Sequence, residues 1–151
     1  ELLKKYVKQP IVANQLQLSI TNSNMISSGM EVNMNTNGAV NRDGSVLNYC
    51  RLNDITIQTW SPFQFGMFEG CFLGNEKFSE LNKVVDELAE KYNVSNTAIA
   101  TAWILRHPAN MQMVAGTTNK ERLIQIAKAC DIELTKEEWY RLYLSAGHIL
   151  P

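Results

Sequence analysis

The sequence has few of the features that mark several large protein classes. Its three cysteines (Cys50, Cys71 and Cys130) are odd in number and far apart, so they form neither a disulfide framework nor a CxxC metal site. No apolar run approaches the roughly 20 residues that span a bilayer, and the charged start does not resemble a signal peptide. We therefore expect a cytoplasmic protein that has no membrane partner.

The chain also lacks an excess of either charge. Its 14 basic and 15 acidic residues give a net charge of -1, whereas a nucleic-acid surface needs a basic excess. Of the 151 residues, 45% are hydrophobic and 19% are charged, which is typical of one globular domain with its own core. Nucleic acid is therefore not expected among the partners.

Three segments have the pattern of strands, and helical segments lie between and after them. The expected strands are residues 11–20, 55–60 and 111–115. Helices are expected over residues 45–52, 78–92 and 95–106, and after two capping boxes at residues 118–121 and 135–138. Residues 21–44, rich in Asn and Ser, are expected to form a long loop. Strands that alternate with helices predict an α/β fold with parallel strands, and three strands suit part of a larger barrel.

The sequence from Val114 to Leu123 turns from a strand through Gly116 into a capped helix. Free N–H groups at a helix start favour anions, yet the cations Lys120 and Arg122 lie in this first turn. A phosphate bound by the Thr117 and Thr118 hydroxyls and the Arg122 fork would explain them. A capped surface helix with solvated charges would give the same pattern.

Two further motifs lie on strands. Trp60-Ser-Pro-Phe63 ends one strand, at the edge where parallel α/β folds bind ligands, and a Trp there either stacks on a flat ring or belongs to the core. Asn14-Gln15 places carboxamides within an apolar strand, where their partner is either a ligand or a neighbouring strand.

The other candidate residues are given structural roles. His107 and His148 lack the further ligands of a metal site, so no metal is expected. The three cysteines are interpreted as buried apolar side chains. Asn93-Val-Ser95 matches a glycosylation sequon but is interpreted as a helix cap.

In this order and spacing, these motifs resemble the C-terminal half of an aldo/keto reductase. Ala102-Trp-Ile-Leu-Arg106 is similar to the family's helix before its last strand, and Glu138 to Leu142 resembles a bacterial subgroup. The resemblance implies that residues 1–151 form the C-terminal half of a (β/α)8 TIM barrel. It also implies an enzyme that uses NADPH, without metal or flavin, to reduce aldehydes and ketones to alcohols.

The family's cofactor residues transfer to positions of this sequence. Gln15 would hydrogen-bond the nicotinamide carboxamide, and Trp60 would stack on the nicotinamide ring. Ser61, Pro62, Phe63 and Gly66 would line the pyrophosphate path. The remaining positions form the adenosine end: Gly116 begins the turn, Thr117, Thr118, Asn119 and Arg122 would hold the 2′-phosphate, and Gln125 would lie near the adenine. Ile126 stands where the family often has an adenine-contacting Asn.

The family's catalytic Asp, Tyr, Lys and His all come from the first half of the barrel, so no residue of this chain is assigned to catalysis. The start at Glu1, within a helix-like segment, indicates a piece of a longer protein. We expect the parent enzyme to be active and this segment alone to be inactive. The expected partner is the missing N-terminal half-barrel or a second copy of the chain. The alternative function is a non-catalytic half-barrel or regulatory nucleotide-binding module.

Overall fold

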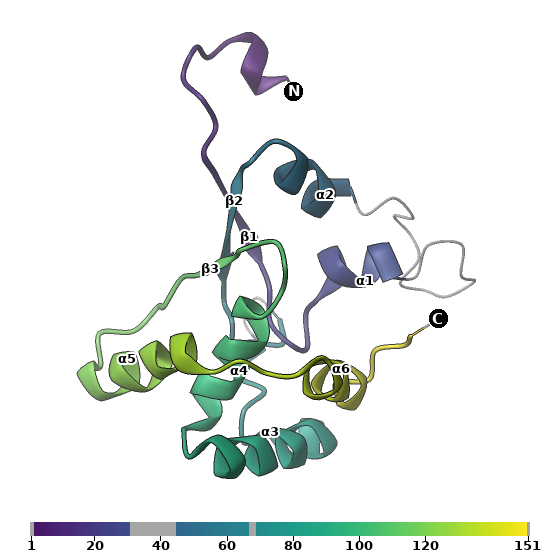
Figure 1. The fold of residues 1–151 in the computed structure, drawn as a ribbon, viewed down its shortest axis with the longest axis vertical. Helices are drawn as coiled ribbons and strands as arrows, with labels where there is room; N and C mark the ends of the chain where they lie inside the picture. Colours follow the sequence, from purple (N-terminus) through teal and green to yellow (C-terminus); the bar gives the residue numbers. More distant parts are fainter. Residues whose placement is uncertain (1, 31–44, 67–68, 151) are drawn as a thin grey trace.

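The computed structural model describes residues 2–30, 45–66 and 69–150. Within these residues, three strands form one parallel sheet in the order β1-β2-β3 (Figure 1). The strands are β1 (Ala13–Gln17), β2 (Thr56–Trp60) and β3 (Gln112–Met113). All three lie within the segments that the sequence predicted, and each is shorter than the prediction.

The helices also follow the predicted order. The α-helices are α1 (Asn24–Met30), α2 (Ser45–Leu52), α3 (Ser79–Tyr92), α4 (Asn96–Leu105), α5 (Lys120–Ala127) and α6 (Lys136–Ser145). Short 3-10 helices are η1 (Leu3–Lys5), η2 (Glu76–Phe78) and η3 (Lys128–Asp131). Helix α1 corrects the prediction of a loop over 21–44, because Ile26 on this helix is buried in the core. The rest of that predicted loop, residues 31–44, lies outside the described residues.

Local capping explains where several helices begin. Ser95 Oγ accepts the N–H of Ala98 at the start of α4, as the cap interpretation of Asn93-Val-Ser95 requires. Thr135 and Glu138 form the predicted capping box of α6, each side chain accepting the other residue's backbone N–H.

One core cluster joins the sheet to the helices and includes Ile26 of α1, Leu47 and Cys50 of α2, and buried residues of α3, α4 and α6. At its centre the rings of Trp103 and Trp139 stack at 4.8 Å and 9°, and each indole N–H donates to the other residue's carbonyl oxygen, at 3.2 and 2.9 Å. Tyr143 also stacks on Trp139, at 5.7 Å and 12°. These three stacked rings, which we call the aromatic column, join α4 to α6.

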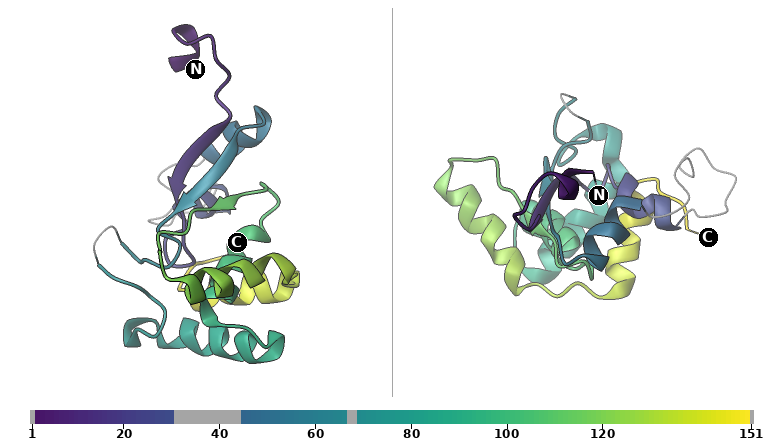
Figure 2. Two further views of the ribbon diagram at one scale, coloured as in Figure 1. Left: turned by 90° about the vertical axis from the view of Figure 1, so that its left-hand side faces the viewer. Right: turned by 90° about the horizontal axis from the view of Figure 1, so that it is seen from above.

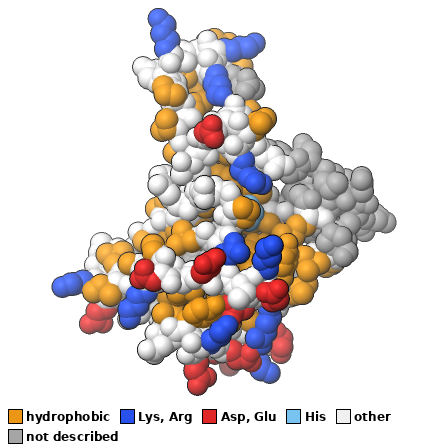
Figure 3. Space-filling view, viewed as in Figure 1, with side chains coloured by type: hydrophobic (Ala, Val, Ile, Leu, Met, Phe, Trp, Pro, Cys, Tyr) orange, Lys and Arg blue, Asp and Glu red, His pale blue; other side chains and the backbone are white. Residues whose placement is uncertain are grey.

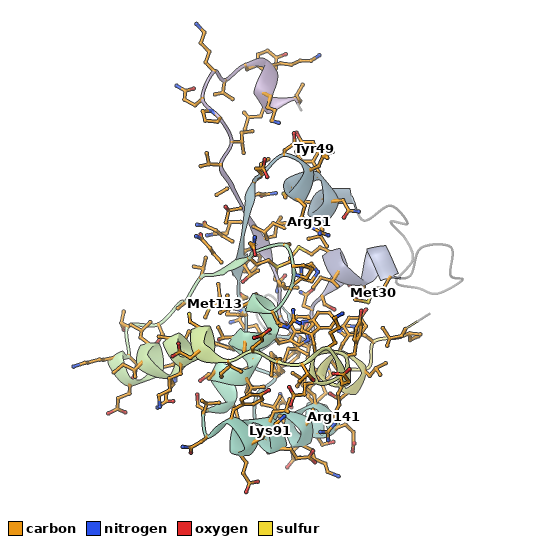
Figure 4. The ribbon with its side chains drawn as sticks, viewed as in Figure 1. Met30, Tyr49, Arg51, Lys91, Met113 and Arg141 are labelled. Carbon is orange, nitrogen blue, oxygen red and sulfur yellow. The ribbon has the colours of Figure 1, made fainter. Side chains whose placement is uncertain are left out.

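Polar and charged side chains link α3 to α6 at the surface. Lys91 Nζ lies 2.5 Å from Glu138 Oε1, Tyr92 Oη donates to Glu138 Oε2 at 2.7 Å, and Arg141 pairs with Glu87. Burial raises the pKa of Glu138, but the hydrogen bonds from Lys91, the Thr135 backbone and Tyr92 outweigh it and leave this pKa below its usual value. Figure 4 labels Lys91 and Arg141 at this end of the molecule, over α3 and α6, and Figure 3 shows both charge signs mixed there.

The two faces of the sheet differ in chemistry. Ile57 and Thr59 point into the helical layer and are fully buried. The opposite face carries Gln15, Gln58 and Gln112, which lie in register across the three strands, and Gln58 Nε2 donates to Gln112 Oε1 at 3.1 Å. We call this second surface the open face. The N-terminal segment extends from the other end of the sheet, away from the carboxyl ends of the strands (Figures 1 and 2).

Candidate functional site

A pocket of about 330 Å³ lies where β2 and β3 end. Because parallel strands end at one edge of the sheet, the loops that follow them converge there. The first loop follows Trp60, and the second leads from Val114 to α5. The pocket is lined by Trp60, Ser61, Pro62, Phe63, Gln64, Cys71, Val114, Gly116, Thr117, Arg122 and Ile126.

The turn after β2 shapes one wall of this pocket. Ser61 has a φ of 52°, a left-handed conformation that is uncommon for a residue other than glycine. It turns the chain directly after Trp60, and Gln64 N–H donates to Ser61 O at 3.1 Å. Backbone strain of this kind concentrates at functional sites, and here it brings Trp60 and Phe63 to the same pocket.

The last part of the loop after β2 places Cys71 in the wall of the pocket. Phe72 N–H donates to Phe63 O at 3.0 Å, and Gln64 bridges to Cys71. Cys71 is exposed, as is Cys130 on η3, and only Cys50 is buried. The expectation that all three are buried was therefore wrong for two of them, because both lie at the surface, Cys71 on the loop after β2 and Cys130 on η3.

Asparagine rather than threonine caps α5. Asn119 Oδ1 accepts the N–H of Arg122 at 3.0 Å, and Thr117 Oγ1 accepts the N–H of Asn119 at 3.2 Å. The predicted capping box from Thr118 was wrong by one residue, because Asn serves the N-cap position equally well. Thr117 and Arg122 line the pocket beside this helix start, whereas Thr118 and Asn119 are exposed beside it.

The remaining predicted cofactor residues lie outside the pocket. Gly66 is further along the loop after β2, and Gln125 is half-buried on α5. Gln15 is exposed on the open face, two residues before the end of β1. Its neighbour Asn14 points the other way, toward α2, where its Nδ2 lies 3.8 Å from Cys50 Sγ. The Asn-Gln pair is thus divided between the two faces of the sheet.

Sequence reasoning gave no role to Gln17, which ends β1 but does not line the pocket. Gln17 lies in register with Trp60, whereas Gln15 lies in register with Gln58. Strand alternation was the available signal, because residues two apart share a face. Gln64 and Cys71 were also missed, since the loop that brings them to the pocket has no regular pattern.

The two histidines lie away from the pocket. His107 precedes β3, at the opposite end of that strand, and its Nδ1 accepts the N–H of Ala109 at 3.2 Å. Burial and the charge of Arg51 lower the pKa of His107 to about 4, so its ring is neutral at pH 7. His148 Nε2 lies 2.7 Å from Ile20 O and 2.9 Å from Ser23 Oγ.

Two findings on the described part of the chain concern metals and membranes. No group of three His, Cys, Asp or Glu side chains there is arranged to hold a metal ion. Among the helices of that same part, none combines the length and apolar character needed to cross a membrane.

Comparison with protein families gives one match over nearly the whole sequence. The model of the aldo/keto reductase family matches residues 2–143. The 6-dehydroglucose reductase of Agrobacterium fabrum is 27% identical over 146 residues, which are 96% of this chain and 42% of that protein. The uncharacterized oxidoreductase YcsN of Bacillus subtilis is 25% identical and is matched over 99% of this chain and 45% of its own length. The chain therefore spans less than half the length of these relatives.

Solved structures show the same fold. The thermostable aldo-keto reductase Tm1743, in complex with the inhibitor epalrestat, superposes with a TM-score of 0.65 at 25% identity, over 93% of this chain and 42% of that one. The Bombyx mori aldo-keto reductase AKR2E4, in complex with NADP, gives a TM-score of 0.64 at 20% identity, over 95% and 40%. The predicted arrangement of three parallel strands and flanking helices, as part of a TIM barrel, is confirmed.

Proposed function

Because this chain belongs to the aldo/keto reductase family, we propose that it supplies most of the NADPH-binding site of an oxidoreductase that reduces aldehydes and ketones to alcohols. One observation carries the proposal: a single pocket joins the strand-end Trp60 to Thr117 and Arg122 at the start of α5. An aromatic face at one end and a cation beside free helix N–H groups at the other suit a flat ring and a phosphate.

The residues at the two ends of the pocket would bind different parts of the cofactor. Arg122 offers a planar fork of donors that matches phosphate oxygens, and the Thr117 hydroxyl adds a neutral donor beside it. Trp60 presents a ring face at the carboxyl end of β2, where it would orient the nicotinamide. When bound, NADPH supplies a hydride for the carbonyl carbon of the substrate. The pocket holds part of such a dinucleotide, and the open face next to Trp60 borders the rest.

A thiol inside the pocket provides the direct test of this proposal. NADPH at about ten times its Kd will slow alkylation of Cys71 by N-ethylmaleimide about tenfold, because only the unliganded fraction reacts. Cys130 is also exposed but does not line the pocket, so its rate will not change. Peptide mass spectrometry over a time course reports both sites in one sample. Equal Cys71 rates with and without saturating NADPH would reject the proposed site.

We further propose that the 151-residue chain binds the cofactor without catalysing the reaction. The family resemblance assigns the residue that protonates the carbonyl oxygen to the other half of the barrel, and the described histidines lie away from the pocket. We expect no aldehyde-dependent loss of NADPH absorbance above the rate without protein. Turnover that scales with the concentration of the purified chain would contradict this assignment.

The substrate carbonyl and the N-terminal half-barrel are the partners that this proposal implies. The half-barrel would pair with the edge of the sheet at β1 or β3 and would cover the open face. A second copy of the chain is the alternative partner for the same surface.

A further inference from the structure

A fully buried hydroxyl joins the segment after β1 to the wall of the pocket. Ser19 Oγ donates to Gln64 O at 2.7 Å and accepts the N–H of Asn22 at 3.1 Å. Gln64 lines the pocket, and its own N–H donates to Ser61 O. A buried hydroxyl that both donates and accepts holds its partners in fixed positions. Residues 19–23, which we call the β1 turn, therefore support the loop that follows β2.

The C-terminal segment runs from α6 to the side of α1 (Figures 1 and 2) and contacts the same β1 turn. His148 Nε2 lies 2.7 Å from Ile20 O and 2.9 Å from Ser23 Oγ. A carbonyl oxygen only accepts, so Nε2 carries the hydrogen and donates it to Ile20 O. Ile20 and Ser23 are fully buried, so bulk water cannot replace His148 as their partner without opening the turn.

Two features fix the position of the His148 ring. Gly147 has a φ of 88°, in the left-handed region that favours glycine, and turns the chain directly before His148. Tyr143 of α6 stacks on the imidazole at 4.5 Å and 27°, and its hydroxyl lies 2.8 Å from Ser27 Oγ on α1. Ser27 Oγ lies 3.2 Å from Ser23 Oγ. These side chains form one polar cluster that joins the β1 turn to α1, α6 and the C-terminal segment.

From these contacts we propose that His148 is a positioning residue for the wall of the candidate cofactor pocket. It holds the carbonyl of Ile20, and the adjacent Ser19 fixes the carbonyl of Gln64 in that wall. His148 does not line the pocket, so it acts only through the β1 turn. The inference rests on the proposed function where it concerns the cofactor, whereas the position of the loop can be measured without any ligand.

Hydrogen exchange of single amides, followed by NMR, tests the positioning in the free chain. Phe72 N–H donates to Phe63 O and joins two parts of the loop after β2, so its exchange reports local opening of the wall. The amide of Trp103, in the buried helix α4, exchanges more slowly and reports global unfolding. His148→Ala will speed exchange at Phe72 about tenfold, because opening of the wall no longer breaks the hydrogen bond to Ile20 O.

His107→Ala is the matched control for this measurement. It removes another half-buried imidazole that accepts one backbone N–H and lies away from the pocket. It will speed exchange at Trp103 and change exchange at Phe72 by about twofold at most. If His148→Ala behaves like this control, His148 has a structural role only and the proposal is overturned.

Conservative variants test the hydrogen bond itself. Glutamine can place its amide nitrogen where His148 Nε2 lies, whereas asparagine is one carbon shorter and cannot reach Ile20 O. His148→Gln will therefore return the exchange rate of Phe72 to within about threefold of the unmodified chain, and His148→Asn will resemble His148→Ala. Equal exchange rates at Phe72 in the Gln and Ala variants would contradict the role of the Nε2 donor.

Ser19→Ala tests the second link between the C-terminal segment and the wall. It removes the donor to Gln64 O and will also speed exchange at Phe72 about tenfold. Because both side chains act through the β1 turn, the double variant with His148→Ala will fall short of the product of the two single effects. Independent effects that multiply fully would show that His148 does not act through Ser19.

Fluorescence titration with NADPH connects the position of the loop to the cofactor. His148→Ala will weaken NADPH binding about three- to tenfold, and His148→Gln will change it by about twofold at most. Faster exchange at Phe72 with unchanged NADPH affinity would overturn the proposed link to the pocket. If the unmodified chain does not bind NADPH, the proposed function fails, and the exchange rates alone then support or reject the positioning of the loop by His148.

Discussion

Replacing Trp103 with alanine will lower the free energy of unfolding by about 3–5 kcal/mol. The Trp103 side chain is fully buried, so its removal leaves a cavity between α4 and α6. It also breaks the stack with Trp139 and leaves the Trp139 carbonyl oxygen without its indole donor. The expected loss is a large part of the 5–15 kcal/mol that typically stabilises a domain. Urea unfolding followed by far-ultraviolet circular dichroism measures it.

Trp60→Ala is the matched control for this experiment. It removes the same side chain from a half-buried position at the pocket, so it will weaken NADPH binding and change the unfolding free energy by only about 1 kcal/mol. A loss below about 1 kcal/mol for Trp103→Ala would show that the aromatic column does not stabilise the helical layer.

Replacing Arg122 with alanine will weaken NADPH binding by about 10- to 100-fold and leave NADH binding nearly unchanged. Charge-assisted hydrogen bonds to a phosphate contribute about 1.5–3 kcal/mol, which corresponds to that range, and only NADPH carries the 2′-phosphate. Fluorescence titration with each dinucleotide gives the two Kd values. The NADPH loss will shrink at high salt, because part of the interaction is screened.

Lys128→Ala serves as the control for charge. Lys128 is exposed on η3, directly after α5, and does not line the pocket. The substitution removes one positive charge near α5 and should change NADPH binding by about twofold at most. An equal loss of NADPH and NADH in Arg122→Ala would place the guanidinium away from the 2′-phosphate and would contradict the proposed orientation of the cofactor.

The sequence was most informative where structure depends on neighbouring residues. Ser95 and Thr135 were recognised as caps because a capping pattern needs only three or four consecutive residues. The same rule misplaced the start of α5, since Thr118 and Asn119 are both good caps and only the turn through Thr117 decides between them. Likewise, an Asn- and Ser-rich composition gave no sign of α1, which is stabilised by burial of Ile26 rather than by helix propensity.

The environment of individual side chains was harder to predict than the positions of helices and strands. Cys71 and Cys130 lie on surfaces that packing leaves uncovered, and a cysteine's neighbours in the sequence do not reveal this. Gln17, at the end of β1, is a second residue whose surroundings the sequence does not reveal. Its register with Trp60 depends on how two strands nearly 40 residues apart pair, which only the folded sheet determines. Which of the predicted residues hold the cofactor stays a prediction, with the pocket as its geometric support.

The row formed by Gln15, Gln58 and Gln112 has a consequence for the heat capacity of association. Burial of apolar surface lowers the heat capacity, whereas burial of polar surface raises it. Any polypeptide that covers the open face will bury carboxamides there, so the two contributions will partly cancel. Association on this face will therefore depend on paired hydrogen bonds, and its enthalpy will vary little with temperature.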